Sequence, residues 1–327
     1  MTGAHDTGRG ARLMTGSNTD DPSISDKTVL VTGGAGFIGS HIAEALVADN
    51  DLRVLDNLSS GRREQVPDDA ELVQGDLRDE SALDWATADV DVIFYQAGLV
   101  SVDRSVDEPV RSHRTNATAT VELLERARRE NARIVVASSC AIYGDPELTP
   151  VPEDAAKTPK SPYAIDKLAL DQYTRAFADL YDLDAVPLRY FNVYGPGQTA
   201  GEYSGVISAF IEQARAGEPI TVHGDGEQTR DFVHVSDVVD ANLAAATTDH
   251  TGRAYNIGTG TSTSIRELAE LIRRTVGSES EIVHTDARPG DVRRSEAAIG
   301  RAREDLHYEP TVPLDEGIAA LIADSRT

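Results

Sequence analysis

Two side chains four residues apart carry the clearest chemical signal in the sequence. Tyr163 and Lys167 lie in a segment with a helical pattern, residues 162–181, and this spacing places them on one face of the helix. A free tyrosine has a pKa of about 10, so it acts as a base near neutrality only when cations stabilise its phenolate. Lowering that pKa by ~3 units requires roughly 4 kcal/mol, which a neighbouring ammonium group and an oxidised nicotinamide could supply. The pair therefore predicts a tyrosine base, although a surface tyrosine and a solvated lysine would share the same spacing.

A glycine turn near the start of the chain predicts where a dinucleotide would bind. A buried strand at residues 29–32 runs into Gly33, Gly36 and Gly39, and a helix begins near Phe37. The first glycine allows a tight turn, the second lets the backbone approach a pyrophosphate, and the third lets the helix pack closely on its strand. The N–H groups and the dipole at the start of this helix favour a phosphate there.

An acidic residue follows at the distance that a ribose contact requires. Residues 52–56 read as a second strand that ends at Asp56. Its carboxylate would accept hydrogen bonds from the adenosine ribose hydroxyls and would repel a 2′-phosphate. The predicted cofactor is therefore NAD rather than NADP.

The remaining pattern predicts the elements that must position these residues. Further strands are predicted at residues 71–76, 90–95, 134–138 and 188–194, and helices at residues 110–130, 204–216, 237–246 and 265–276. Strands that alternate with helices favour a Rossmann-type doubly wound parallel α/β sheet with ligands at the carboxyl ends of its strands. After residue 191 the alternation loosens, which indicates a smaller C-terminal α/β lobe.

These patterns predict three parts of the chain. Residues 1–24 are expected to be a disordered tail, without the apolar core of a signal peptide or a membrane span. Residues 25–190 are the predicted NAD-binding domain, to which parts of 225–260 return. Residues 191–327 are mainly the predicted nucleotide-sugar-binding lobe.

The charge and the cysteine content of the chain disfavour several classes of function. The formal net charge is −24, the chain has only four lysines, and the acidic residues are scattered through all 327 positions, which is typical of surfaces adapted to high salt. An ordinary acidic cytosolic protein is the alternative. Such a surface is a poor partner for nucleic acid, since phosphate binding requires basic patches. Cys140 is the single cysteine, so neither a disulfide framework nor a thiolate metal cluster is expected. We predict a cytoplasmic protein without a bound metal.

Arginines form the one dense basic stretch of the sequence. Residues 288–294 contain Arg288, Arg293 and Arg294, and Arg230 is a further candidate. A solvated charge run would have the same composition. In an acidic chain, however, these arginines are the expected contacts of an anionic substrate.

From residue 27 to the C-terminus the sequence resembles the extended short-chain dehydrogenase/reductase superfamily, and within it the NAD-dependent nucleotide-sugar epimerases of the UDP-glucose 4-epimerase type. Any one of the shared motifs could arise by chance, but the full series in this order hardly could. The motifs are the glycine turn, Asp56-Asn57-Leu58, Gly75-Asp76-Leu77, Ser139 before Tyr143-Gly144, Tyr163 with Lys167, the run from Arg189 to Pro196, Arg230-Asp231-Phe232 and Arg288-Pro289-Gly290-Asp291.

The resemblance implies a catalytic triad and a reaction. Tyr163 would remove the proton of the sugar's 4-OH while C4 passes a hydride to NAD⁺. Lys167 would hold the nicotinamide ribose and lower the pKa of the tyrosine, and Ser139 would bridge the 4-OH to the phenolate. The 4-keto sugar would then present its other face, and the hydride and proton would return with inverted configuration.

The resemblance also implies two sets of binding residues and a homodimer. Cofactor contacts are expected at Gly33, Gly36, Phe37, Ile38, Gly39, Asp56, Asn57, Ser60, Gly61, Asp76, Leu77, Gln96, Ala97, Gly98, Asn116, Tyr163, Lys167 and Tyr190. UDP-sugar contacts are expected at Ser139, Asn192, Val206, Thr221, His223, Arg230, Arg288, Asp291 and Ser295.

Departures from related enzymes refine the expected substrate. Dehydratases and decarboxylases of this type carry an acid at the position of Ala141, and dehydratases also at Cys140, so both reactions are disfavoured here. Cys140 is expected to pack beside the site rather than act as a nucleophile. Ser295 is small where plain-hexose epimerases have a bulky residue, which indicates that N-acetyl sugars are accepted. Val100 replaces a lysine that lies near the cofactor in some members of the family.

Three alternatives stay open at this point. A UDP-glucuronate 4-epimerase or another nucleotide-sugar oxidoreductase would use the same triad. A catalytically silent NAD-binding regulator is a third possibility, although it would have no need to retain Ser139, Tyr163 and Lys167 together.

The acidic, lysine-poor composition predicts a salt-dependent stability. We expect the melting temperature to rise steeply as KCl is increased toward molar concentrations, because the Debye length then falls to ~3 Å and repulsion between carboxylates is screened. Thermal unfolding over a KCl series measures this, and a flat profile would show that the charge reflects something other than salt adaptation.

Overall fold

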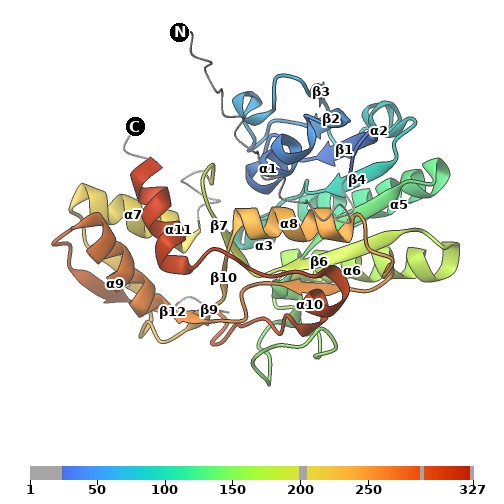
Figure 1. Ribbon diagram of the computed structural model, residues 1–327. Helices are drawn as coiled ribbons and strands as arrows, with labels where there is room; N and C mark the ends of the chain where they lie inside the picture. Colours follow the sequence, from blue (N-terminus) through green and yellow to red (C-terminus); the bar gives the residue numbers. More distant parts are fainter. Residues whose placement is uncertain (1–23, 199–204, 288–290, 325–327) are drawn as a thin grey trace, which may run out of the picture.

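The predicted alternation of strands and helices is present in the computed structural model, which describes residues 24–198, 205–287 and 291–324. Within these residues, the main sheet consists of seven strands: β1 (Thr28–Thr32), β2 (Asp51–Asp56), β3 (Glu71–Gln74), β4 (Val92–Tyr95), β5 (Arg133–Ser139), β6 (Ala185–Tyr190) and β11 (Tyr255–Ile257). Their order is β11-β6-β5-β4-β1-β2-β3, and every neighbouring pair is parallel (Figure 1). The fold is therefore the Rossmann-type α/β fold that the sequence predicted.

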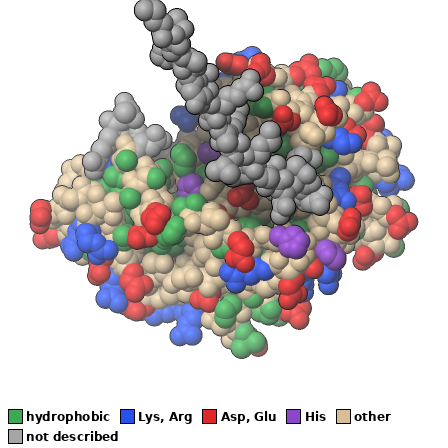
Figure 2. Space-filling view, in the orientation of Figure 1, with side chains coloured by type: hydrophobic (Ala, Val, Ile, Leu, Met, Phe, Trp, Pro, Cys, Tyr) green, Lys and Arg blue, Asp and Glu red, His purple; other side chains and the backbone are tan. Residues whose placement is uncertain are grey.

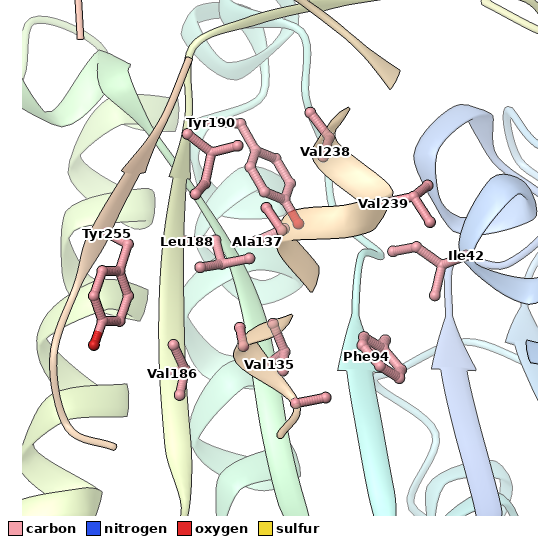
Figure 3. Packing of buried hydrophobic residues seen from close by; sticks show 14 of the residues in the cluster. Ile42, Phe94, Val135, Ala137, Val186, Leu188, Tyr190, Val238, Val239 and Tyr255 are labelled. Carbon is pink, nitrogen blue, oxygen red and sulfur yellow. The ribbon is translucent and has the colours of Figure 1, made fainter. Parts of the chain in front are cut away.

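Helices cover both faces of this sheet. One layer contains α1 (Phe37–Leu46), α8 (Val235–Ala245) and α10 (Gly300–Leu306), and the other contains α2 (Glu80–Thr87), α5 (Ala119–Glu130) and α6 (Pro162–Tyr181). Val29 and Val31 of β1 pack into the first layer and Leu30 into the second, as the alternation of side chains along a strand requires. Figure 3 shows the first layer, where Val239 of α8 lies next to Ile42 of α1. Strands buried on both faces explain the continuous apolar runs in the sequence.

Helix α6 is specified by its own first turn. The Ser161 hydroxyl accepts a hydrogen bond from the backbone N–H of Ala164 at 3.2 Å, and Pro162 occupies the first helical position. Both are favoured helix-start signals, because they satisfy or remove N–H groups that lack an intrahelical partner. The helix bounds therefore agree with the predicted residues 162–181, and Tyr163 lies in the first turn.

The helical segment predicted at residues 110–130 is interrupted. Helices α3 (Val102–Asp107) and α4 (Pro109–His113) are followed by a π-helical turn, Arg114–Thr118, before α5 begins. Inside this turn, Asn116 is fully buried, and its side chain bonds both backbone groups of Leu99. The wider turn thus lets a polar side chain reach the loop after β4, a bond that the apolar periodicity cannot reveal.

The strand predicted at residues 188–194 is divided at Phe191. The Phe191 N–H still bonds Ile257 of the main sheet, but the N–H of Asn192 bonds the carbonyl of Asp231. β7 (Asn192–Tyr194) therefore pairs with β10 (Phe232–His234) in a separate sheet. The chain leaves the main sheet here and enters the lobe. The third strand is also shorter than predicted and ends at Gln74 rather than at residue 76.

The C-terminal lobe has its own hydrophobic core. It contains α7 (Val206–Ala216), α9 (Ile265–Val276), α11 (Leu314–Asp324), β8 (Ile220–His223), β9 (Thr229–Arg230), β12 (Thr263–Ser264) and β13 (Ile282–Thr285). β8 and β13 pair in parallel, and β9 and β12 pair antiparallel. Figure 1 shows α7, α9 and α11 together at the side of the molecule away from α5 and α6. The predicted return of residues 225–260 corresponds to α8 and β11, and α10 also packs on β11.

A buried ion pair fixes α6 against the sheet. Arg189 of β6 contacts Asp171 of α6 through Nε at 2.8 Å and Nη2 at 2.9 Å, and neither side chain is more than 1% exposed. Arg189 Nη1 also donates to the hydroxyl of Tyr143 and to the carbonyl of Glu153. The Ser138 hydroxyl donates to Asp171 as well. The end of β5, the turn after it, β6 and α6 are thus joined in one polar network.

Candidate functional site

One cavity of about 460 Å³ contains both the glycine turn and the Tyr163–Lys167 pair. It lies at the carboxyl ends of β1, β2, β4, β5 and β6, where a doubly wound sheet binds its ligands. The predicted cofactor residues that line it are Gly33, Gly36, Phe37, Ile38, Gly39, Asp56, Asn57, Ser60, Asp76, Leu77, Gln96, Ala97, Gly98, Tyr163, Lys167 and Tyr190.

The glycine turn provides an open phosphate cradle. Gly33 has a φ of +71°, and a Cβ there would lie 2.7 Å from the backbone of Ala97, so only glycine fits. A Cβ on Gly39 would collide with the carbonyl of Gly33. Gly36 caps α1 without any side-chain hydrogen bond, so the first N–H groups of the helix face the cavity without a side-chain acceptor. These features fit the pyrophosphate of a dinucleotide.

Asp56 closes the glycine turn as well as facing the cavity. Its carboxylate accepts hydrogen bonds from the N–H groups of Ala35 at 3.0 Å and Leu58 at 2.8 Å. A carboxylate has about four acceptor positions, so two remain for the hydroxyls of a ribose. The sequence analysis predicted the ribose contact, which stays a prediction, and missed the bond to Ala35, which lies 21 residues earlier.

A second acid, Asp76, lies at the β2–β3 side of the cavity. Arg78 contacts it at 2.7 Å, and the Asn57 amide donates to it at 2.8 Å. Hydrogen bonds from Arg78 hold the pKa of Asp76 well below its usual range, despite an opposing effect of burial. Arg78 also lines the cavity and was not predicted from the sequence.

Two predicted cofactor residues do not line the cavity. A Cβ on Gly61 would lie 2.6 Å from the carbonyl of Ala35, so this glycine lets its loop pack on the glycine turn. Asn116 instead holds Leu99, as described above, and its Oδ1 would lie 2.9 Å from a Cβ on Gly98. Both residues support the wall of the cavity without lining it. Gly61 leaves room for the backbone of Ala35, and the side chain of Asn116 holds the backbone of Leu99.

Ser139, Tyr163 and Lys167 meet at one end of the cavity. Ser139 ends β5, and the Tyr163 N–H donates to the hydroxyl of Ser105 at 3.1 Å. Lys167 Nζ donates to the carbonyl of Ala137 at 2.6 Å and lies 6.0 Å from the centroid of the Tyr163 ring. The three side chains come from two elements that the Asp171–Arg189 network joins.

Burial dominates the proton affinities of the pair. It raises the pKa of Tyr163 to about 12, against a smaller opposing effect of the hydrogen bond with Ser139. It lowers the pKa of Lys167 to about 8, against the attraction of Asp166. The predicted lowering of the tyrosine pKa by Lys167 together with an oxidised nicotinamide concerns the loaded site and stays a prediction. Reaching neutrality from about 12 requires roughly 7 kcal/mol, so further positive charge beside the phenol is needed.

The predicted substrate residues divide into two groups. Ser139, Asn192 and Val206 line the cavity. Thr221, His223, Arg230, Asp291 and Ser295 do not line it, and Arg288 lies outside the described residues. Lobe residues that the sequence analysis missed complete this part of the wall, and they are Phe191, Val193, Tyr194, Gly197, Gln198, Gly205, Ile207 and Phe232.

Arg230 is occupied by other parts of the lobe. It forms an ion pair with Asp291 and donates to the carbonyls of Thr229 at 2.7 Å and Val292 at 2.6 Å. Two residues predicted to contact an anion thus neutralise each other in this structure. Thr221 bonds the side chain of Gln213 instead.

Ser295 lies beside the catalytic end without lining it. It is 8% exposed and hydrogen-bonds the thiol of Cys140, the neighbour of Ser139. Burial raises the pKa of Cys140 to about 11, which disfavours its reactive thiolate. The expectation that Cys140 packs beside the site is confirmed.

Two further arginines line the cavity and were not predicted. Arg104 contacts Glu108 at 3.1 Å and Arg111 contacts it at 2.9 Å. Their spacing of four and three residues from Glu108 along the chain was the signal that could have indicated this cluster. Val100, where some family members have a lysine, lies in the same wall.

The described residues contain neither a membrane-spanning helix nor a candidate metal site. None of their helices has the length and apolar character needed to cross a membrane. In the same part of the chain, no group of His, Cys, Asp and Glu side chains could hold a metal ion.

Comparison with known proteins gives consistent matches over most of the chain. The model of the "NAD dependent epimerase/dehydratase family" matches residues 29–258. A UDP-glucose 4-epimerase of Mycolicibacterium smegmatis is 42% identical over 302 residues, covering 90% of this chain and 96% of that protein. A UDP-N-acetylglucosamine 4-epimerase of Methanobrevibacter ruminantium, solved with UDP-N-acetylmuramic acid, has a TM-score of 0.89 and 36% identity, with 93% and 100% covered. A UDP-glucose 4-epimerase of Thermotoga maritima, solved with UDP-glucose, has a TM-score of 0.89 and 37% identity, with 91% and 98% covered.

The geometry of Asp56 generates a prediction about cofactor choice. We expect NAD to bind much more tightly than NADP, because the carboxylate would accept hydrogen bonds from ribose hydroxyls and would repel a 2′-phosphate. In Asp56→Ala the difference in Kd should narrow, and titration calorimetry with both dinucleotides measures it. Asp51→Ala, at the exposed start of β2, is the matched control. Equal affinities in the parent protein would refute the assignment.

Proposed function

The chain belongs to the NAD dependent epimerase/dehydratase family, and on that basis we propose that it is an NAD-dependent 4-epimerase of UDP-hexoses. The observation that carries the proposal is the single cavity in which the glycine turn meets Ser139, Tyr163 and Lys167. Its wall continues into the lobe through Asn192, which is where the nucleotide sugar would lie. UDP-glucose and UDP-galactose are the proposed substrate pair, together with their N-acetylated counterparts.

The proposed mechanism assigns one task to each member of the triad. The glycine turn, Asp56 and Lys167 would hold NAD, which would supply an acceptor, and later a donor, of the hydride at C4. Tyr163 removes the proton of the 4-OH, and the Ser139 hydroxyl, which lines the same cavity and acts to lower the pKa of Tyr163, bridges the two oxygens. The Lys167 ammonium stabilises the phenolate and binds ribose hydroxyls. After the keto sugar turns, Tyr163 gives the proton back to the oxygen on the other face.

Burial limits the conditions under which Tyr163 can act as a base. With a pKa of about 12 in the protein alone, Tyr163 keeps its proton at physiological pH. Proton removal therefore depends on positive charge near the phenol oxygen. We propose that Tyr163 acts as a base only when the cofactor is bound. Neither Cys140 nor Ala141 offers an acid beside the keto sugar, so we propose that the reaction stops at epimerisation.

The role of Tyr163 as the base is tested by removing its phenol oxygen. We expect Tyr163→Phe to retain the fold and bound NAD, while epimerisation of UDP-glucose falls by at least the ~10² to 10⁴ typical of general base catalysis. Chromatographic separation of the 4-epimers gives the rate. Tyr181→Phe is the matched control, since this tyrosine ends the same helix, is exposed and lies outside the proposed dimer surface. Turnover within tenfold of the parent would move the base elsewhere.

Substrate range is tested at Ser295. Ser295 does not line the cavity but lies next to Cys140 at its catalytic end, and we propose that its small side chain leaves room there for an N-acetyl group, so UDP-N-acetylglucosamine should be converted at a rate comparable to UDP-glucose. Ser295→Tyr should suppress the N-acetyl substrate and largely spare the plain hexose, because lost space discriminates against the larger ligand. Ser295→Ala controls for the lost hydrogen bond with Cys140. If kcat/KM for both sugars falls equally, or for neither, Ser295 does not control substrate size.

We further propose a homodimer formed through α3, α4 and α6. These neighbouring helices carry the exposed apolar side chains Val102, Val106, Val110, Ile165 and Tyr173. Light scattering checks this, and a mass near 35.1 kDa, that of one chain, would refute it.

Two proposals concern the environment of the protein. Adaptation to high salt is supported by acidic side chains scattered over the visible face rather than gathered in one patch (Figure 2), and the KCl series above tests it. A cytoplasmic location is supported by the substrates, since NAD and UDP-sugars are intracellular metabolites. Cell fractionation tests the location, and recovery outside the cytoplasmic fraction would refute it.

A further inference from the structure

Two side chains near the glycine turn hold a turn of the C-terminal lobe. The lobe turn follows β7 and comprises residues 195–198. His41 Nε2 lies 2.9 Å from the carbonyl oxygen of Pro196, and Gln65 Nε2 donates to the carbonyl of Gly197 at 3.4 Å. Since a carbonyl oxygen only accepts, the His41 ring carries a proton on Nε2 and donates it. The mechanism described above gives neither donor a task.

Both donors come from elements that are fixed to the glycine turn. His41 lies in the second turn of α1, and its ring meets that of Phe37 edge-on, with 6.0 Å between the centroids. Gln65 ends a 3₁₀ turn, and the residue before that turn, Arg62, donates its N–H to the carbonyl of Ala35 at 2.9 Å. The two donors therefore keep a fixed position relative to the phosphate cradle.

The lobe turn has a backbone that allows this close approach. Gly197 has a φ of +81°, and a Cβ there would lie 3.1 Å from Gln65 Nε2, closer than ordinary van der Waals contact. A Cβ on Gly195 would lie 2.6 Å from Val235 Cγ1. The Gln198 N–H bonds the carbonyl of Gly195 at 3.4 Å and closes the turn. Glycine on both sides of the proline thus lets the turn lie close against its neighbours.

The two hydrogen bonds lie at the wall of the cofactor cavity. Gly197 and Gln198 line this cavity together with Gln65 and Phe37, whereas His41 does not line it. The bonds therefore close the wall at the place where the glycine turn meets the lobe. His41 can affect a bound dinucleotide only through the residues that it holds in place.

We propose that His41 and Gln65 are positioning residues that keep the 195–198 turn closed against the glycine turn and thereby retain the dinucleotide. The proposal rests on the function proposed above, since epimerisation needs the same reduced cofactor for both hydride transfers and the protein must hold it between them. Each hydrogen bond stabilises the closed arrangement, so loss of one bond raises the population in which the turn has moved away.

The exchange of NADH tests this proposal, because it needs no UDP-sugar. Protein loaded with NADH is mixed with an excess of NAD, and the loss of NADH fluorescence gives the dissociation rate. In His41→Phe, which keeps a ring against Phe37 and removes the donor, dissociation should be about fivefold faster, the factor typical of one lost hydrogen bond. Gln65→Met, which keeps the length of the side chain without its donor, should behave alike, and the double variant should show a larger effect.

The association rate separates closure of the turn from a direct contact with the cofactor. It is measured by mixing nucleotide-free protein with NADH. A turn that opens more often speeds both entry and release, so the association rate should rise as well, and Kd should change by less than the dissociation rate does. Loss of a direct contact would leave the association rate unchanged and raise Kd by the whole factor.

Two further variants serve as controls. His41→Gln replaces the ring with another side chain that carries an N–H donor, so both rates should return toward those of the parent. Glu44→Gln changes an exposed residue of α1 and should leave both rates unchanged.

The outcomes are distinct. Faster exchange in both directions in His41→Phe and Gln65→Met, with His41→Gln closer to the parent, supports the proposal. Parent-like exchange in the folded variants, or faster dissociation with unchanged association, overturns it. Gln65→Met gives the answer if His41→Phe does not fold. Failure of the epimerase assignment would appear separately, as the expected change in NADH exchange in a protein that does not convert UDP-sugars.

Discussion

The arrangement of the site depends on the buried ion pair between Asp171 and Arg189. Isolated charges in a protein interior cost several kcal/mol each, and removing one partner of such a pair typically destabilises a protein by ~3–5 kcal/mol. Here the guanidinium bonds the carboxylate twice and also bonds Tyr143 and Glu153, so its donors are well used. Helix α6 cannot rotate or slide without leaving a buried charge unpaired. This is why a tyrosine and a lysine in its first two turns keep a fixed position relative to the end of β5.

The same interior creates a conflict that the chemistry must resolve. A dry environment strengthens every interaction with a developing charge, but it also raises the pKa of Tyr163 and lowers that of Lys167. The cavity's arginines do not remove this conflict, because Arg78 is paired with Asp76 and the cluster around Glu108 shares its charge. The Lys167 Nζ lies 6.0 Å from the centroid of the Tyr163 ring, so this lysine is a cation near the base, although burial lowers its own pKa. A chain with a net charge of −24 thus keeps few uncompensated cations even where it handles anionic ligands.

Several parts of the structure were predictable because short stretches of sequence specify them. The Ser161-Pro162 start defines the helix that carries Tyr163, and the spacing of four residues brings Lys167 to the same face. The glycine turn likewise needs no distant partner to be recognised. Asn116 and Arg230 were assigned to binding, yet one holds a loop and the other an ion pair with Asp291. Asparagine and arginine side chains suit both ligand binding and structural contacts. Only the residues that the fold brings next to them decide which of these roles they have.

The sequence by itself determined the alternating strands and helices, the parallel sheet, the glycine turn, the acidic end of β2 and the residue types of the proposed triad, because these follow from local spacing and apolar periodicity. Tertiary structure decided which polar residues face the cavity. Arg230 does not line it because it pairs with Asp291, 61 residues away in the chain, and Arg189 is fixed by Asp171, 18 residues away. It also decided the proton affinities of Tyr163 and Lys167. These proton affinities depend on burial and on charges that other helices bring close, and neither can be derived from the spacing of residues along the chain.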